Sequence, residues 1–200
     1  MKRRYLLLAL LAAAAAPAPA ATGPEAPVAQ LDAALLAAMR LGPAGFAARA
    51  ALLRPVIEQA FDLRQILQVS VGPRFAALPA DQQATLLDVF IRYTVASYAA
   101  NFDGFDGQRF DILPQTRAVG ADRVVATQIV PRSGDATRID YQVREGTAGW
   151  RIVDILFDGS ISRVAVQRSD FRALLRGGSA APLIDSLRRK VASLEAGGKS

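Results

Sequence analysis

The apolar pattern of this chain changes from a helical to a strand period at the run DGFDG, which spans Asp103 to Gly107. Before this run, apolar residues recur at the three- and four-residue spacing of a helix, and after it they alternate as in a half-buried strand. Clusters of turn-forming residues separate the alternating segments. The sequence therefore predicts four strands, which are Gln108 to Leu113, Arg123 to Val130, Thr137 to Arg144 and Trp150 to Phe157.

Helical patterns lie on both sides of these strands. The longest predicted helix opens at Pro79 and reaches about Asn101, and its broad apolar stripe is rich in aromatic residues. The other predicted helices are Pro27 to Leu41, two short helices between Ala44 and Phe61 separated at Pro55, a helix capped by Asp62 that runs to about Val69, Ser160 to Arg176, and Pro182 to Leu194. We therefore expect an α+β fold, a twisted antiparallel sheet of about four strands with several helices covering one face.

Burial of apolar residues suggests a register for the sheet. Pairing Tyr141 with Val153 brings apolar residues together, and so does pairing Ile129 with Ile139, whereas a one-residue slip moves every side chain to the other face. The face expected to lie under the helices comprises Val125, Thr127, Ile129, Ile139, Tyr141, Val143, Val153, Ile155 and Phe157. The opposite face, with Arg138, Asp140, Gln142, Arg144 and Asp154 diluted by Ile152 and Leu156, is expected to be mostly solvated.

The first twenty residues have the pattern of a signal peptide. A positive start at Lys2 to Arg4 precedes an apolar stretch, and Ala18-Pro-Ala20 matches a small-residue cleavage site. We expect residues 1–20 to be removed and residues 21–200 to form one exported domain. The formal net charge of +6 would fall to about +3, because the leader contains three cations and no acid.

The composition excludes several kinds of chemistry. The chain has no cysteine and no histidine, so it forms no disulfide, no Cys/His zinc site and no Ser-His-Asp triad. We expect neither a cofactor nor a metal. Its arginines are scattered along the sequence rather than clustered, which argues against a nucleic-acid partner.

Two stretches resemble the MlaC-type family of periplasmic lipid shuttles. One is FIRYTVASYAANFDGFDGQRF, from Phe90 to Phe110, where an aromatic helix runs into a Gly-Gln-x-aromatic strand; the other is GWRIVDILFDGSISRVAVQRSDFRALLRGG, from Gly149 to Gly178. The likeness covers nearly all of the chain after the leader. The runs YAANFDGFDGQRF and VQRSDFR are more similar to the hopanoid-associated HpnM branch than to the phospholipid shuttle of enteric bacteria.

This resemblance implies a function and its partners. Proteins of the family hold lipid acyl chains between such a sheet and such helices, so we expect an apolar lipid cavity there. The protein would carry a membrane lipid, a phospholipid or a hopanoid, across the periplasm between an outer-membrane partner and an inner-membrane ABC transporter. A carrier is needed because each buried methylene contributes about 0.8 kcal/mol, or on the order of 20 kcal/mol for two acyl chains.

The expected cavity residues come from the long helix and the sheet. They are Phe90, Thr94, Tyr98, Phe102, Ile129, Ile139, Tyr141, Ile155 and Phe157. The hydroxyls of Tyr98 and Tyr141 could contact a headgroup or an ester, or the two rings could be ordinary core. The DGFDG run is interpreted first as a helix-to-strand turn that needs glycine, and second as a hinge at the mouth of the cavity.

Two other functions remain open on the sequence alone. A small exported hydrolase or isomerase could work without histidine through a carboxylate pair such as Asp154 and Asp158. An adaptor with a filled core would have no cavity between the sheet and the helices.

Overall fold

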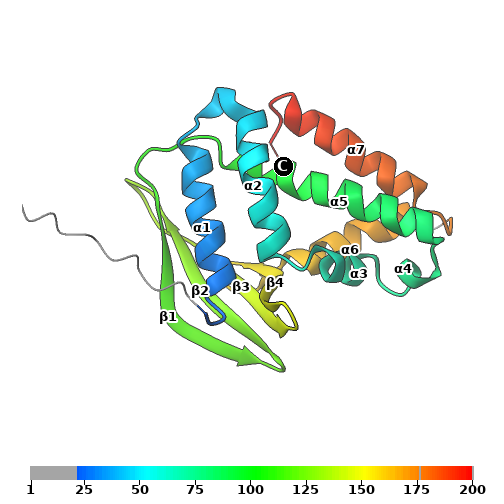
Figure 1. Ribbon diagram of the computed structural model, residues 1–200, viewed down its shortest axis with the longest axis horizontal. Helices are drawn as coiled ribbons and strands as arrows, with labels where there is room; N and C mark the ends of the chain where they lie inside the picture. The colour runs from blue at the N-terminus through cyan, green and yellow to red at the C-terminus, as the bar shows by residue number, and fades with distance from the viewer. Residues whose placement is uncertain (1–21, 176, 200) are drawn as a thin grey trace, which may run out of the picture.

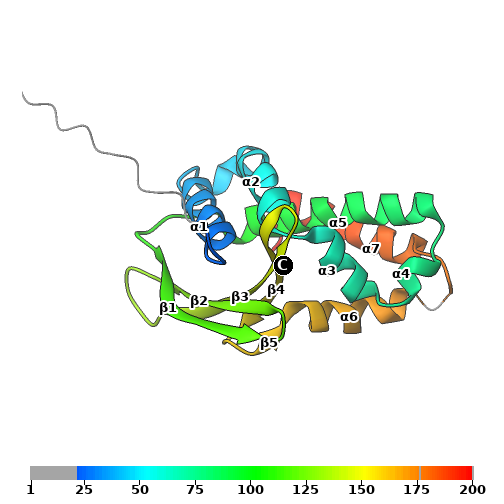
Figure 2. The same ribbon diagram turned by 60° about the horizontal axis from the view of Figure 1, so that its bottom comes forward.

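The computed structural model describes residues 22–175 and 177–199 (Figures 1 and 2), so the predicted signal peptide lies outside the described residues. The sheet occupies one end of an elongated molecule, and most of the helices extend beyond it. The helices are α1 (Ala26–Met39), the short 3₁₀ helix η1 (Pro43–Gly45), α2 (Phe46–Ala60), α3 (Leu63–Val71), α4 (Arg74–Ala77), α5 (Ala80–Asn101), α6 (Arg163–Leu174) and α7 (Ala181–Glu195).

The sheet is antiparallel throughout and has the simple order β1-β2-β3-β4-β5. Its strands are β1 (Arg109–Val119), β2 (Asp122–Val130), β3 (Thr137–Gly146), β4 (Gly149–Phe157) and β5 (Ile161–Ser162). The predicted α+β class is confirmed, with a fifth strand of two residues added. Because Ile161 and Ser162 pair with β4, α6 begins at Arg163 rather than at the predicted Ser160.

Helix α1 lies across one face of the sheet, and α5 runs from beyond the sheet to its edge, with α7 beside it (Figures 1 and 2). The core joins the inner faces of these helices to the sheet. Leu31 and Leu35 of α1, Leu53 and Ile57 of α2, and Phe90 of α5 are almost completely buried. Burying apolar surface of this kind is the main favourable term in folding, so this layer fixes the position of α5 relative to the sheet.

Two other predictions are wrong next to a proline. Helix α2 continues through Pro55, although the sequence predicted two short helices there. Burial of Leu53 and Ile57 on either side offsets the hydrogen bond that Pro55 cannot make. Strand β1 extends past Pro114 to Val119 instead of ending near Leu113, with a register shift between Ile112 and Thr116. A proline is tolerated here because β1 is an edge strand.

The predicted register is wrong by two residues over most of the sheet. Tyr141 pairs with Ile155 rather than Val153, and Ile139 pairs with Thr127 rather than Ile129. A two-residue slip keeps each side chain on the same face, because strand side chains alternate with a period of two. The predicted inner face of β3 is therefore preserved despite the wrong partners.

A bulge changes the inner face of β4. The pairing shifts between Gln142–Asp154 and Val143–Ile152, so Val153 is an extra residue in β4. Beyond the bulge, Ile152 belongs to the core cluster that was predicted to include Val153. The link before α3 fixes Ile152 there, because the Asp62 backbone N–H donates to the Ile152 carbonyl at 2.9 Å.

The outer face of the sheet is less solvated than predicted. Asp140 is completely buried, and the guanidinium of Arg138 holds it through two bonds of 2.9 and 3.0 Å. Asp122 is likewise buried and accepts bonds from Gln142 and Arg144. Buried carboxylates are normally paired in this way, and the long arginine stems shield the strands beneath them.

Candidate functional site

A cavity of about 300 Å³ lies between the sheet and the helices. Its wall combines the inner face of α5, the ends of β3 and β4, and the first turns of α6. Helix α3 and Phe61, which lies between α2 and α3, complete it. The lining residues are Phe61, Leu63, Ile66, Phe90, Thr94, Ser97, Tyr98, Asn101, Phe102, Ile139, Tyr141, Asp154, Ile155, Phe157, Arg163, Val164 and Gln167. The wall is mostly apolar and aromatic, as in pockets that bind small hydrophobic molecules.

The structure places eight of the nine sequence-predicted residues around this cavity, and Ile129 is the exception. Phe90, Thr94, Tyr98 and Phe102 recur on one face of α5 and just beyond its end, which is why helical spacing found them. Ile129 is a residue of β2 that pairs with Phe110 of β1 and Thr137 of β3, and it does not line the cavity. Its predicted position depended on the register that proved wrong by two residues.

Sequence reasoning missed the part of the wall that other elements contribute. Leu63 and Ile66 come from α3, and Arg163, Val164 and Gln167 come from α6. Their spacing shows that they share one face of each helix. The spacing does not show that these faces line the same cavity as α5. Ser97 lies one turn beyond Thr94 on the same face of α5, so the predicted stripe itself could have found it.

Aromatic rings form a continuous row along one side of the cavity. The ring centroids of Phe61 and Tyr98 are 5.9 Å apart, those of Tyr98 and Phe102 are 5.8 Å apart, and those of Phe102 and Phe110 are 6.1 Å apart. At the other end, Phe90 meets Phe171 edge-on at 6.4 Å. Such ring pairs pack rigidly, so the wall is largely shaped before any ligand enters.

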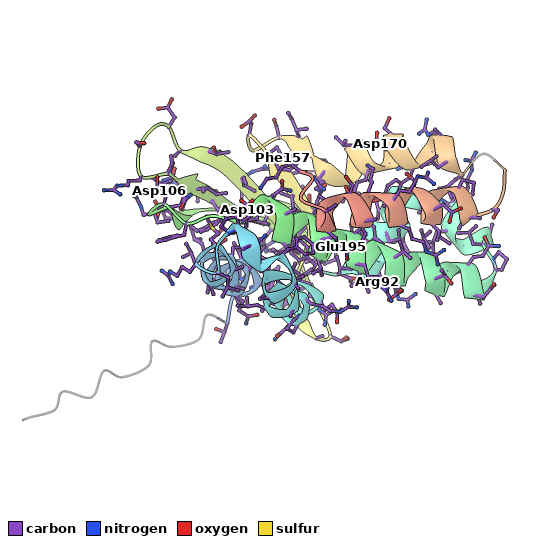
Figure 3. The ribbon with its side chains drawn as sticks, turned by 90° about the horizontal axis from the view of Figure 1, so that it is seen from above. Arg92, Asp103, Asp106, Phe157, Asp170 and Glu195 are labelled. Atoms are coloured by element: carbon purple, nitrogen blue, oxygen red, sulfur yellow. The ribbon has the colours of Figure 1, made fainter. Side chains whose placement is uncertain are left out.

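The cavity has a buried end and an exposed end. Phe61, Leu63, Ile66, Phe90 and Val164 are all buried. Phe157, in contrast, is 37% exposed, and it pairs with the exposed Ile161 of β5. Figure 3 shows Phe157 near the sheet, while Asp170 marks the part of α6 that leads away from it. The mouth therefore lies at the sheet end, and the interior extends along α5.

Most polar groups in the wall are satisfied by the protein itself. The Thr94 hydroxyl donates to the Phe90 carbonyl at 2.9 Å, and Gln167 accepts a bond from Ser70 at 3.2 Å. Asp154 accepts bonds from the Ile155 and Val164 backbone N–H groups and from the Ser162 hydroxyl. The Ser97 hydroxyl, which is buried, has no partner among the described residues.

Burial perturbs three ionisable groups in and beside the cavity. It raises the pKa of the Tyr98 and Tyr141 hydroxyls, with a smaller effect from the Asp32 carboxyl on each. Burial also raises the pKa of Asp32 itself to about 7. Both tyrosines therefore stay neutral at physiological pH and present uncharged hydroxyls.

The carboxylate pair of the hydrolase hypothesis does not converge on the cavity. Asp154 lines it, but Asp158, the second carboxylate of the hydrolase hypothesis, does not. Asp154 also caps the start of α6, which occupies its oxygens. Among residues 22–175 and 177–199, no group of three or more acidic side chains is arranged to hold a metal.

None of the described helices is by itself long and apolar enough to cross a membrane. The segment Ala26–Met39 together with Pro43–Ala60 meets those criteria by length and composition, but the pair is bent by 118°.

Comparison with known proteins gives a family and a fold. The sequence profile described as "MlaC protein" matches residues 30–189. A phospholipid-binding protein from Ralstonia solanacearum, solved in complex with a phospholipid, superposes with a TM-score of 0.73 at 21% identity, covering 86% of this chain and 99% of that one. No curated protein matches the chain in sequence. The structural likeness confirms the mixed fold with its open antiparallel sheet.

Proposed function

Because this chain belongs to the MlaC family, whose profile covers most of its length, we propose that it is a periplasmic lipid carrier. The observation that supports this most directly is the apolar, aromatic-lined cavity between the sheet and α5. Proteins of this family are periplasmic in general. The solved phospholipid complex of the Ralstonia protein supports a membrane lipid as the cargo.

The cavity suits hydrocarbon better than a polar substrate. Its volume of about 300 Å³ is twice the ~150 Å³ of an engineered apolar cavity that stays dry and binds benzene. Each methylene transferred from water into such a site contributes about 0.8 kcal/mol. An alkyl tail lying along the aromatic row would therefore be held firmly without any covalent step.

We propose that the protein is a binding protein rather than an enzyme. The carboxylate pair of the hydrolase hypothesis does not converge on the cavity, since only Asp154 lines it. An adaptor with a filled core fits poorly as well, because the space between sheet and helices is open at Phe157. The shuttle would pass a phospholipid or a hopanoid between an outer-membrane partner and an inner-membrane ABC transporter.

The test is to identify what the protein carries. Native mass spectrometry of protein purified without detergent should show a bound lipid, and solvent extraction should release it. In the variant Ile139→Trp, the larger side chain projects into the cavity and should abolish the bound mass. The control Val69→Trp places the same side chain on an exposed position of α3 that does not line the cavity.

Two results would count against the carrier. One is wild-type protein that is empty and takes up no lipid from vesicles of phosphatidylethanolamine and phosphatidylglycerol. The other is an Ile139→Trp variant that carries as much lipid as Val69→Trp, which would place the lipid elsewhere.

A further inference from the structure

Arg163 is the one cation among the described residues that line the cavity. It is the first residue of α6 and is half-buried. It forms no hydrogen bond and no ion pair with any other described residue, unlike the arginines at positions 138 and 144, which hold Asp140 and Asp122. A partly buried guanidinium without an acceptor loses part of its hydration and gains no hydrogen bond from the protein, which is unfavourable.

The surroundings of Arg163 do not supply the missing anion. Asp154 is the one carboxylate among the described residues of the wall, and it forms no ion pair with Arg163. Its oxygens are already engaged by two backbone N–H groups and the Ser162 hydroxyl. The helix dipole adds to the positive charge, because Arg163 occupies the N-terminal end of α6.

The position of Arg163 along the cavity is set by the packing of α6 against its neighbours. Further along α6, Gln167 bonds to Ser70 of α3, and Phe171 meets Phe90 of α5. Arg163 therefore lies at the opposite end from Phe90, and its charge acts on the Tyr98 hydroxyl. This is the end of the cavity where Phe157 is exposed.

We propose that Arg163 binds an anionic phosphate group of the cargo at the mouth of the cavity, with the alkyl tail directed inward toward Phe90. This inference rests on the proposed function and narrows it, since a lipid with a phosphate head is preferred over an uncharged one. Arginine suits this role because its planar fork donates two parallel bonds to phosphate oxygens. The neutral Tyr98 hydroxyl lines the same cavity, and the charge of Arg163 acts on it.

The test compares two ligands that share a tail and differ in the head. Delipidated protein is loaded with the neutral apolar dye N-phenyl-1-naphthylamine, which is then displaced by decyl phosphate or by 1-decanol. We expect decyl phosphate to displace the dye from wild-type protein at about tenfold lower concentration, the lower end expected for a charge-assisted bond at a half-exposed site. In Arg163→Gln this difference should disappear, while displacement by 1-decanol stays unchanged.

Two further variants and one further ligand complete the design. Arg163→Lys should keep part of the preference, because it retains the charge but not the fork. Arg168→Gln removes an arginine from the same helix that does not line the cavity, and it should behave as wild type. Inorganic phosphate should not displace the dye, which separates a lipid headgroup from free phosphate.

The outcomes distinguish this inference from the carrier function. If Arg163→Gln binds decyl phosphate as tightly as wild type, or if inorganic phosphate competes at the same concentration as decyl phosphate, the assignment of Arg163 is wrong. If wild-type protein binds neither the dye nor either decyl compound, the carrier function itself fails.

Discussion

Asp32 is a buried carboxyl on α1. The residue is 7% exposed, and neither carboxylate oxygen accepts a hydrogen bond from a described residue. Burial raises its pKa to about 7, compared with about 3.9 in an unfolded chain. The folded protein therefore binds a proton between these values that the unfolded chain releases, which links the stability of the fold to pH.

The direction of this effect follows from the raised pKa. Between about pH 4 and pH 7 the folded state holds more protons, so stability falls as pH rises, by up to roughly 1.4 kcal/mol per pH unit. In Asp32→Asn this contribution is absent. Urea unfolding should show the variant gaining about 3 kcal/mol relative to wild type between pH 5 and pH 8.

The control for this measurement is Asp88→Asn, which changes an exposed carboxylate on α5 that pairs only with Arg92. It should follow wild type within about 0.5 kcal/mol at every pH. Parallel pH profiles for Asp32→Asn and wild type would show that Asp32 is already ionised in the folded protein at low pH.

Individual cavity residues could be predicted where one element contributes several of them. The period of α5 is enough to group Phe90, Thr94 and Tyr98, and alternation is enough to group Ile139 with Tyr141. Arg163 could not be predicted. Its importance depends on the lack of an ion-pair partner among the described residues and on how α6 packs. The same is true of Asp32, which the apolar pattern of α1 gave no reason to single out.

At the scale of elements, Arg49 joins three segments of the helical layer. It is 2% exposed on α2, and its Nε donates to the Ala99 carbonyl in the last turn of α5 at 2.8 Å. A second nitrogen donates to the Gly42 carbonyl, just after α1. A cation is favourable there, because the carbonyls at the end of a helix carry its negative dipole charge.

Replacing Arg49 with leucine should therefore destabilise the protein by about 3 kcal/mol, since two carbonyls lose charge-assisted bonds in a buried site. Arg54→Leu, on the exposed side of the same helix, removes only an ion pair with Glu58 and should cost less than about 0.5 kcal/mol. Denaturant unfolding measures both. Equal losses in the two variants would mean that Arg49 contributes no more than a surface arginine.

The start of α3 was predicted correctly from its capping side chain. Asp62 accepts a bond from the Gln65 backbone N–H at 2.9 Å and begins α3, as its position in the sequence predicted. The start of α6 was placed too early because the two residues of β5 have no periodicity of their own. The bulge at Val153 was likewise invisible, since it depends on the contact between β4 and the residues before α3.

At the scale of the whole molecule, a cavity of this kind makes the stability of the carrier depend on its load. A ligand that binds only the folded state stabilises it by about 2.7 kcal/mol at a hundred times its Kd. For a chain of this size the melting temperature should rise by roughly 5–10 °C.

Differential scanning fluorimetry with a short-chain phospholipid below its critical micelle concentration measures this shift. Ile139→Trp should show little or no shift, while Val69→Trp should match wild type. A shift of the same size in Ile139→Trp would indicate binding outside the cavity.

The fold class and the family followed from the sequence, because both depend on the order of elements along the chain. The cavity itself did not follow from residue patterns, and only the resemblance to lipid shuttles led us to expect it. A gap between layers depends on how far apart packing holds α5, α6 and the sheet, and no single element encodes that distance. Its mouth and its buried end became distinguishable only from the exposure of Phe157 and the burial of Phe90.

The two borders of the sheet affect whether copies of the protein can associate through their strands at high concentration. Pro114 and the irregular pairing around it interrupt β1, and β5 offers only two residues. On the other border, the bridge between Phe61 and Ile152 and the bulge at Val153 interrupt the part of β4 that β5 leaves uncovered. Neither border therefore provides the long, regular row of N–H and carbonyl groups that a strand from another copy needs. The sheet therefore resists growing from one molecule into the next, which is the step that starts a fibril.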